Sequence, residues 1–215
     1  MRKSVLAVAS MLAFASVGAN AADFTLGGVV GISGAGVEAS AKFSEHVGVR
    51  ANVTGISYNF DYEYDGIDYD TDTDLTIGSL WLDLYPAGGV FRITLGASSY
   101  DAQFGLSATP PPGNIYLIGG TPYPSTQVGT LTGNIEYKKV VPYVGIGWDF
   151  GARKKSGFGV ALDLGVFFRG DPDSVTLTSS GTVVSSANLA LESSNIEDDT
   201  LGVQPTVAVS FYYRF

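Results

Sequence analysis

The sequence predicts an all-β protein, a single closed antiparallel transmembrane β-barrel, and three observations lead to this fold class. The N-terminus has the pattern of a secretory signal, several segments alternate strictly between apolar and polar residues, and no later run of about 20 apolar residues could form a membrane helix. Only helices and closed barrels satisfy all backbone polar groups inside a bilayer. An exported chain with an apolar, aromatic and Gly-rich composition is therefore expected to be a barrel.

The N-terminal segment predicts export. Arg2 and Lys3 give a charged start, an apolar run of Val, Leu, Ala and Phe follows, and Ala19-Asn20-Ala21 supplies the small residues of a signal-peptidase site. The apolar run is too short to span a bilayer. We therefore expect residues 1–21 to be a cleaved signal peptide and residues 22–215 to form one barrel domain.

The composition of the chain limits its class of function. It contains 28 Gly, 12 Tyr and 12 Phe, only 15% of its residues are charged, and its formal net charge is −9. A nucleic-acid binder needs a basic face, so we expect no nucleic-acid partner. The chain has no cysteine, which excludes both a disulfide framework and a thiol site. Its stability must then come from a real core or from closed sheet hydrogen bonding.

The end of the chain forms the clearest predicted strand. Nearly every second side chain from Val203 to Phe215 is apolar, and those between them are mostly polar and end in Arg214. Such an alternation with a period of two is typical of a strand that has one apolar and one polar side. In an outer-membrane barrel the apolar side contacts lipid, and Tyr and Phe form a girdle at the membrane interface.

Seven further segments alternate in the same way, which makes eight the predicted number of strands. The expected strands lie near residues 24–33, 36–43, 47–62, 70–84, 90–107, 130–150, 157–170 and 203–215. Short turns near 44–46, 85–89 and 151–157 and longer loops near 63–73, 108–129 and 171–202 have the asymmetry expected of periplasmic turns and outer loops. A ten-stranded alternative stays open, in which a turn at Lys138-Lys139 splits the sixth strand and a further strand lies near 173–180.

The alternation loses phase at two places, near Gly55 and near Gly78-Ser79. Glycine at such a slip predicts either a β-bulge or the point where the strand leaves the bilayer. Two of the loops show patterns of their own. Five prolines in residues 108–129 oppose both helix and sheet, and residues 187–200 could hold a short helix.

Four segments carry a resemblance to a known family. They are the end of the chain, Ser210-Phe-Tyr-Tyr-Arg-Phe215, and residues 82–92, 142–148 and 158–168. These segments resemble small Gram-negative outer-membrane β-barrel proteins, a group of largely uncharacterised proteobacterial members. The resemblance implies an outer-membrane location, contact with outer-membrane lipid and lipopolysaccharide, and recognition of the terminal aromatic residues Tyr213 and Phe215 by the barrel-assembly machinery. We expect the barrel to be a monomer.

Charged residues fall on the inward face of the predicted strands. They are Glu38, Lys42, Arg50, Asp83, Arg92, Asp163, Arg169 and Arg214. An eight-stranded barrel has an interior just wide enough for side chains, and an isolated buried charge is costly, so these residues must pair or stay hydrated. They predict a hydrogen-bonded network that closes the lumen. The alternative, a narrow pathway for ions or apolar solutes, needs a wider barrel.

Seven acidic residues, with no Lys or Arg among them, lie where the third predicted strand passes into the fourth. They are Asp61, Glu63, Asp65, Asp68, Asp70, Asp72 and Asp74. They predict a hairpin that turns near Asp65-Gly66 and carries carboxylates at a period of two. A hard cation such as Ca²⁺ or Mg²⁺ could bridge these oxygens weakly, and the alternative is a solvated acidic loop.

The residues argue against a hydrolase. Barrel-type lipases and proteases generally use a histidine together with Ser or Asp, and the only histidine, His46, lies in a predicted periplasmic turn. The sequence contains no nucleophile elbow, zinc-protease motif or P-loop. We expect a non-enzymatic envelope protein without a tightly bound cofactor, with a structural or surface-interacting role. The alternative is a small pore for ions or apolar solutes.

Overall fold

The structure is a computed structural model, and it describes residues 23–64, 67–109, 111, 113–198 and 202–215. Residues 1–22, which include the predicted signal peptide, lie outside the described residues, as does the predicted hairpin turn at Asp65-Gly66. Over the ranges that the structure describes, we find no helix with the length and apolar character needed to cross a membrane.

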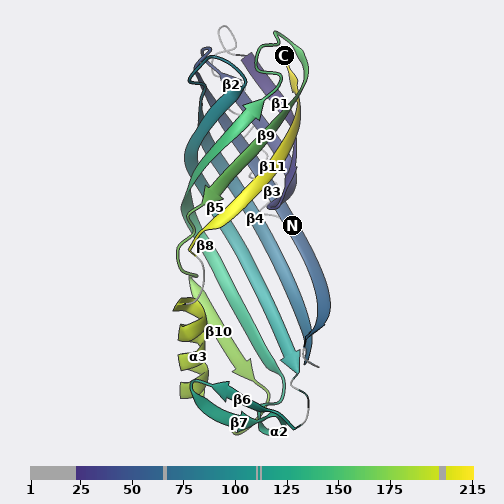
Figure 1. The fold of residues 1–215 in the computed structure, drawn as a ribbon, viewed down its shortest axis with the longest axis vertical. Coiled ribbons are helices and arrows are strands. Elements are labelled where there is room, and N and C mark those ends of the chain that lie inside the picture. Colours follow the sequence, from purple (N-terminus) through teal and green to yellow (C-terminus); the bar gives the residue numbers. More distant parts are fainter. Residues whose placement is uncertain (1–22, 65–66, 110, 112, 199–201) are drawn as a thin grey trace, which may run out of the picture.

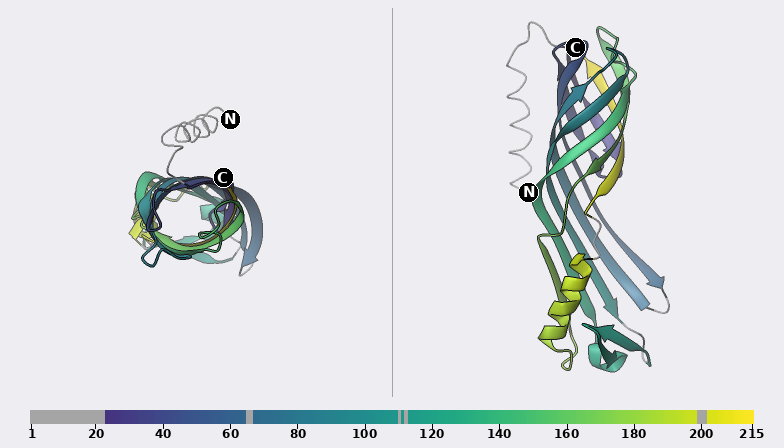
Figure 2. Two further views of the ribbon diagram at one scale, coloured as in Figure 1. Left: turned by 90° about the horizontal axis from the view of Figure 1, so that it is seen from above. Right: turned by 60° about the vertical axis from the view of Figure 1, so that its left-hand side comes forward.

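Eight antiparallel strands close into a barrel, which confirms the predicted fold class and strand number (Figure 1). Their order around the barrel is β1-β2-β3-β4-β5-β8-β9-β11, and β11 pairs with β1 to complete the ring that Figure 2 shows from above. The strands are β1 (Asp23–Gly31), β2 (Gly34–Lys42), β3 (Val47–Tyr64), β4 (Ile67–Leu84), β5 (Phe91–Thr109), β8 (Leu131–Asp149), β9 (Gly157–Phe167) and β11 (Gln204–Arg214).

The barrel wall is tall on one side and low on the other. β3, β4, β5 and β8 have 18 or 19 residues, whereas β1, β2, β9 and β11 have 9 to 11. The tall strands continue past the ends of the short ones and form a curved open sheet (Figures 1 and 2). We call this part the extension and define it as the described residues within 56–77, 100–138 and 170–198. We call the opposite end the turn end, because it carries the short connections at residues 43–46, 85–90 and 150–156.

β3 and β4 pair without interruption along their whole length. Eighteen consecutive residue pairs connect them, from Val47 and Leu84 at the turn end to the tip of the hairpin. This register excludes β-bulges near Gly55 and Gly78-Ser79, which are one of the two alternatives given for the phase slips. The other alternative, that the strands leave the bilayer at these points, stays a prediction. The apolar side chains change there from the outer to the inner face along the same regular strands.

A further strand, β10 (Ser174–Ser179), pairs with the part of β8 that lies beyond β9. β8 runs straight through Lys138 and Lys139, so the alternative turn that would split it is wrong. Both lysines instead hold the segment that leads into β10. The backbone N–H of Lys138 donates to Asp173 at 2.5 Å, and the Nζ of Lys139 lies 3.1 Å from the other carboxylate oxygen of Asp173. These two contacts, the backbone N–H first, lower the pKa of Asp173.

The long loops contain more regular structure than the sequence predicts. The proline-rich segment after β5 forms a hairpin of β6 (Ile115–Ile118) and β7 (Thr121–Pro124), followed by the short helix α2 (Ser125–Val128). Prolines are tolerated there because β6 and β7 form a separate two-stranded sheet, in which each strand is an edge strand. The predicted helix in the last loop is confirmed as α3 (Ser186–Asp198).

The extension has a small apolar core of its own. Its residues are Ile118, Tyr123 and Val128, with Leu131, Val184 and Leu189 packed against them. Two hydrogen bonds tie α3 to the β6–β7 hairpin: the backbone N–H of Gly119 donates to Glu192 at 2.9 Å, and the side-chain amide of Asn188 donates to the Tyr123 hydroxyl at 2.7 Å. The extension is therefore a folded part of the molecule and not a set of independent loops.

The barrel wall has a largely polar inner face near the turn end and an apolar outer face. Exposed apolar side chains on the outer face include Leu26, Val37, Leu80, Leu95, Val144, Leu164, Val207 and Phe211. Soluble monomers rarely expose a continuous apolar surface that surrounds the molecule, whereas a barrel in lipid requires one. The outer surface therefore suits a bilayer.

Candidate functional site in the barrel lumen

Five charged side chains from β2, β3, β4, β5 and β9 meet inside the barrel. They are Glu38, Arg50, Asp83, Arg92 and Asp163, each no more than 6% exposed. Arg50 lies at the centre of this group, which we call the lumen network. Its Nη1 is 2.8 Å from Asp163 and 3.3 Å from Glu38, and its Nε is 3.0 Å from Asp83. The alternation along each strand brings every one of these residues to the inner face.

Arg92 completes the lumen network. Its Nη2 donates to both carboxylate oxygens of Asp163, at 2.9 and 2.8 Å, and its Nη1 lies 3.9 Å from Asp83. The Thr94 hydroxyl donates to Asp83 at 2.6 Å. Three carboxylates thus share two guanidinium groups, and each carboxylate contacts at least one of them. Buried charges are tolerated only when they are paired and hydrogen-bonded in this way. The network therefore fills this level of the lumen and joins strands from different parts of the wall.

Arg214 lies apart from the lumen network, near the turn end. Its Nη2 is 3.3 Å from Asp149 and its Nη1 is 3.4 Å from Asp23, and the Tyr212 hydroxyl also donates to Asp149. Asp149 is absent from the charges predicted to line the lumen. The sequence did contain a signal for Asp149, because every second residue of β8 before it also points inward. Extending the alternation of β8 to its last residue would have assigned Asp149 to the inner face.

The other two predicted lumen residues contact aromatic rings. The Nζ of Lys42 lies 3.9 Å from the centre of the Tyr85 ring at the turn end. Arg169 follows the end of β9, and its guanidinium carbon lies 4.7 Å from the centre of the Tyr137 ring. Both are cation–π contacts. The structure thus divides the eight predicted charges into the lumen network, the Arg214 group and two cations on aromatic rings.

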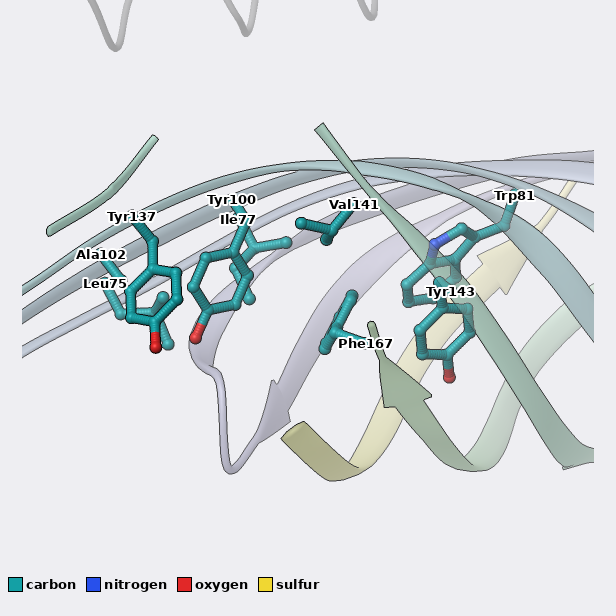
Figure 3. Packing of buried hydrophobic residues seen from close by; sticks show 9 residues of the cluster. All are labelled: Leu75, Ile77, Trp81, Tyr100, Ala102, Tyr137, Val141, Tyr143 and Phe167. Carbon is teal, nitrogen blue, oxygen red and sulfur yellow. The ribbon is translucent and has the colours of Figure 1, made fainter. Parts of the chain in front are cut away.

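An aromatic layer of Trp81, Tyr143 and Phe167 lies next to the lumen network on the side of the extension, and Figure 3 shows its side chains. The rings of Trp81 and Tyr143 stack with their centroids 4.3 Å apart and their planes at 14°, and the Phe167 ring lies 4.9 Å from Tyr143. The guanidinium carbon of Arg50 is 4.8 Å from the centre of the Trp81 ring, so the layer and the network are in contact. The indole N–H of Trp81 donates to Ser98 at 3.3 Å. The layer is therefore a second buried cluster inside the barrel, next to the lumen network.

Two glycines make room for the Tyr143 ring. A Cβ on Gly165 would lie 2.2 Å from the Tyr143 hydroxyl oxygen, and a Cβ on Gly145 would lie 2.6 Å from it. Gly145 and Gly165 are direct partners across β8 and β9. Any larger residue at either position would have to displace the ring. The glycine content, which the sequence analysis used only to assign a protein class, thus has a specific packing role here.

Beyond the aromatic layer, the inner face of the extension stays apolar. Its side chains join the same cluster as Trp81 and Tyr143, and Figure 3 shows the buried members. The cluster members from this part are Ile56, Leu75, Ile77, Tyr100, Ala102, Phe104, Ile135 and Tyr137. Sequence analysis missed this cluster. The phase slips near Gly55 and Gly78 were its signal, because apolar residues move to the inner face just beyond these glycines.

The acidic hairpin lies on β3 and β4 in the extension. Its exposed acidic residues are Asp61, Asp70, Asp72 and Asp74, and Asp61 is directly opposite Asp70. The side chains of Glu63 and Asp68, and the whole of Asp65, lie outside the described part of the chain. Among the side chains that the structure describes, no group of three or more His, Cys, Asp or Glu residues could hold a metal ion. Weak Ca²⁺ or Mg²⁺ binding by the complete hairpin stays a prediction.

Tyr213 and Phe215, the predicted assembly signal, point outward at the turn end. The Tyr213 ring lies 5.1 Å from the Phe215 ring and 5.2 Å from the Phe158 ring, and the Phe215 ring lies 6.1 Å from Phe24. The backbone N–H of Phe215 also donates to the Phe24 carbonyl at 3.0 Å. These rings form part of an aromatic girdle at the turn end, the position expected for a membrane interface.

Comparison with known proteins places the fold but not the activity. No family model matches the sequence, and no curated protein matches it significantly. Among solved structures, CarO of Acinetobacter baumannii is 23% identical over 89% of this chain and 97% of that chain, with a TM-score of 0.66. CarO2 of the same organism is 21% identical over 91% of this chain and 100% of that chain, with a TM-score of 0.67. Both are outer-membrane β-barrel proteins.

A third solved barrel is more distant. Ail of Yersinia pestis, solved in complex with the heparin analogue sucrose octasulfate, is 10% identical over 90% of this chain and 97% of that chain. Its TM-score of 0.37 is too low to support an argument from similarity. The two CarO structures and the closed ring of eight strands agree with each other. The chain therefore has the fold of a small outer-membrane β-barrel protein.

Proposed function

We propose that this chain is a non-enzymatic outer-membrane protein whose barrel is closed to solutes and whose extension has a structural or surface-interacting role. The observation that carries the proposal is the pair of buried clusters inside the barrel, the lumen network around Arg50 and the aromatic layer around Trp81. A lumen filled with paired charges and packed rings leaves no continuous aqueous path. The folded extension is then the largest part of the molecule that partners can reach.

We further propose that the turn end faces the periplasm and that the extension faces the outside. The apolar outer surface and the aromatic girdle support a position in the bilayer. The N-terminal sequence supports export with a cleaved signal peptide. Outer-membrane barrels have short periplasmic turns and long outer segments, and this chain has the same asymmetry. Outer-membrane lipid and lipopolysaccharide would surround it, and one chain completes the ring, which supports a monomer.

The position of His46 supports a non-enzymatic role. This residue is exposed in the short turn between β2 and β3, at the turn end. A substrate in the outer leaflet or outside the cell would lie at the opposite end of the barrel. Acyl-transfer chemistry generally needs a base such as histidine within hydrogen-bond reach of a nucleophile. The only histidine of the chain is therefore on the wrong side for such a reaction.

Conductance in a planar bilayer tests the closed lumen. We expect the refolded protein to give no steady single-channel openings, because a permeating ion would have to displace the ion pairs of Arg50 and Arg92. Steady openings whose amplitude changes in Asp83→Asn but not in Asp61→Asn would contradict the proposal. Asp61→Asn is the matched control, since this substitution removes one carboxylate from the extension and leaves the lumen intact. That outcome would support the alternative, a small pore.

We also propose that Phe215 belongs to a signal recognised by the barrel-assembly machinery. Phe215 is 64% exposed, so its removal should cost the folded barrel less than about 1 kcal/mol. Deleting Phe215 is expected to lower the amount of assembled barrel in cells several-fold and to leave the unfolding midpoint in detergent nearly unchanged. Quantifying the protein in the outer-membrane fraction, and its denaturant unfolding after refolding, would measure both effects.

Phe43→Ala is the control for the Phe215 deletion. Phe43 is another exposed aromatic residue near the turn end, 54% exposed, and lies far from the chain terminus in sequence. We expect this variant to assemble in cells nearly as well as the unmodified protein. Equal losses of assembled protein in both variants would show that Phe215 acts only as a residue of the girdle.

A further inference from the structure

An aromatic groove lies on the outer wall of the barrel near the turn end. It has a volume of ≈ 460 Å³ and crosses β9, β11 and β1, where Phe158 is opposite Tyr213 and Tyr213 is opposite Leu26. Its main lining side chains are Leu26, Phe150, Lys154, Phe158, Phe211 and Tyr213. Gly27 and Gly159 also line it, and the backbone at these positions forms part of its floor. The groove is therefore a largely apolar surface with one cationic side chain, Lys154, in its lining.

The cation belongs to a basic turn in an acidic protein. Residues 150–156 connect β8 and β9 and contain Arg153, Lys154 and Lys155, which are three of the 12 basic residues of a chain with net charge −9. All three are exposed. This turn has no acidic residue of its own. The local charge at the end of the groove is therefore opposite to the charge of the whole chain.

Lys154 lies at the groove and has hydrogen-bond donors left for a ligand. Its Nζ donates to the carbonyl oxygen of Phe158 at 2.8 Å, which fixes the ammonium group beside the aromatic side chain. Within the described ranges, no carboxylate lies within the 4.0 Å of an ion pair with Lys154. An ammonium group has three donors, so two remain for a ligand. An anionic oxygen is the acceptor that would bind them most strongly.

We propose that this groove binds one anionic glycerophospholipid from the periplasmic leaflet. An acyl chain would lie between Phe158, Phe211 and Leu26, and the phosphate would accept hydrogen bonds from Lys154. The position at the turn end, which the proposed orientation places at the periplasmic interface, selects phospholipid over the lipopolysaccharide of the opposite leaflet. The basic turn selects an anionic headgroup over a zwitterionic one, because each Lys or Arg near an anionic lipid surface adds attraction.

The test is binding of phosphatidylglycerol and phosphatidylethanolamine, with the same acyl chains, to the refolded full-length barrel in detergent. Native mass spectrometry would count the lipids that each protein retains during a titration. We expect phosphatidylglycerol to bind with a stoichiometry of one and more tightly than phosphatidylethanolamine. Lys154→Gln should weaken phosphatidylglycerol binding about five-fold, the effect of one interfacial cation, and should leave phosphatidylethanolamine binding nearly unchanged.

Two further variants distinguish lipid binding in the groove from non-specific attraction of anionic lipid to the basic turn. Lys155→Gln removes the same charge from the same turn, but Lys155 does not line the groove. We therefore expect it to change the logarithm of the dissociation constant for phosphatidylglycerol by less than half as much as Lys154→Gln does. Phe158→Ala should weaken the binding of both lipids, because it shortens the apolar wall. Equal effects of Lys154→Gln and Lys155→Gln would overturn the proposal, and so would equal binding of the two lipids. Conductance is a separate measurement, so neither result depends on whether the lumen is closed.

Discussion

Replacing Arg50 with alanine is expected to lower the free energy of unfolding of the refolded barrel by about 3–5 kcal/mol. Arg50 is 1% exposed and contacts the carboxylates of Glu38, Asp83 and Asp163. Without it, three buried carboxylates would share the single guanidinium group of Arg92. Removing one partner leaves the others desolvated and unpaired, and this penalty exceeds the net value of the original pairs. Denaturant unfolding in detergent, followed by circular dichroism, would measure the change.

Two controls make the Arg50 result specific. Arg50→Lys keeps the charge but loses the planar guanidinium group that reaches several carboxylates at once. We therefore expect it to lower the free energy of unfolding, but by less than Arg50→Ala does. Lys42→Ala removes another inward cation, which contacts the Tyr85 ring, and should cost less than about 1 kcal/mol. A loss below about 1 kcal/mol in Arg50→Ala would show that water reaches the lumen network and screens it.

Replacing Trp81 with alanine is the second change with a large expected effect, also about 3–5 kcal/mol. Trp81 is 7% exposed, stacks on Tyr143 and lies against the guanidinium group of Arg50. Its removal would leave a cavity between the aromatic layer and the lumen network, since the closed backbone ring cannot collapse to fill it. The same unfolding experiment would report the loss.

Trp81→Phe is the matched control for the aromatic layer. Phenylalanine keeps a ring beside Tyr143 and has no N–H, so it loses only the hydrogen bond to Ser98 and part of the packing volume. We expect this variant to lose less than half of the stability that Trp81→Ala loses. If both variants lost the same amount, the hydrogen bond to Ser98 would be the main contribution of Trp81, and stacking would contribute little.

The alternation of side chains predicted the barrel and most of its lumen network. Glu38, Arg50, Asp83, Arg92 and Asp163 were all assigned to the inner face from the period of two alone, and the structure brings these five together. Arg169 was assigned to the inner face by the same rule. It follows the end of β9 at Phe167, and its guanidinium group lies on the Tyr137 ring of the inner apolar cluster instead of joining the lumen network.

The inner face of the extension could not be predicted in the same way. Apolar residues such as Leu75 and Ile77 alternate with Thr76 and Asp74 just as lipid-facing residues would. A period of two states that one face is apolar, but it does not state which face that is. The phase slip at Gly78-Ser79 contained the answer, yet a bulge would produce the same slip. Only the continuous register of β3 and β4 distinguishes a bulge from a regular strand whose apolar side chains move from the outer face to the inner face.

The unequal heights of the wall also determine where the barrel opens most easily. The seam between β11 and β1 contains 7 residue pairs and the seam between β8 and β9 also contains 7, whereas β3 and β4 share 18. β9 and β11 are joined to each other by 11 pairs, so they form a two-strand unit between the two shortest seams. Local opening requires least free energy where the fewest backbone hydrogen bonds must break. Thermal fluctuations of the barrel should therefore begin at this pair of strands, while the tall wall stays paired.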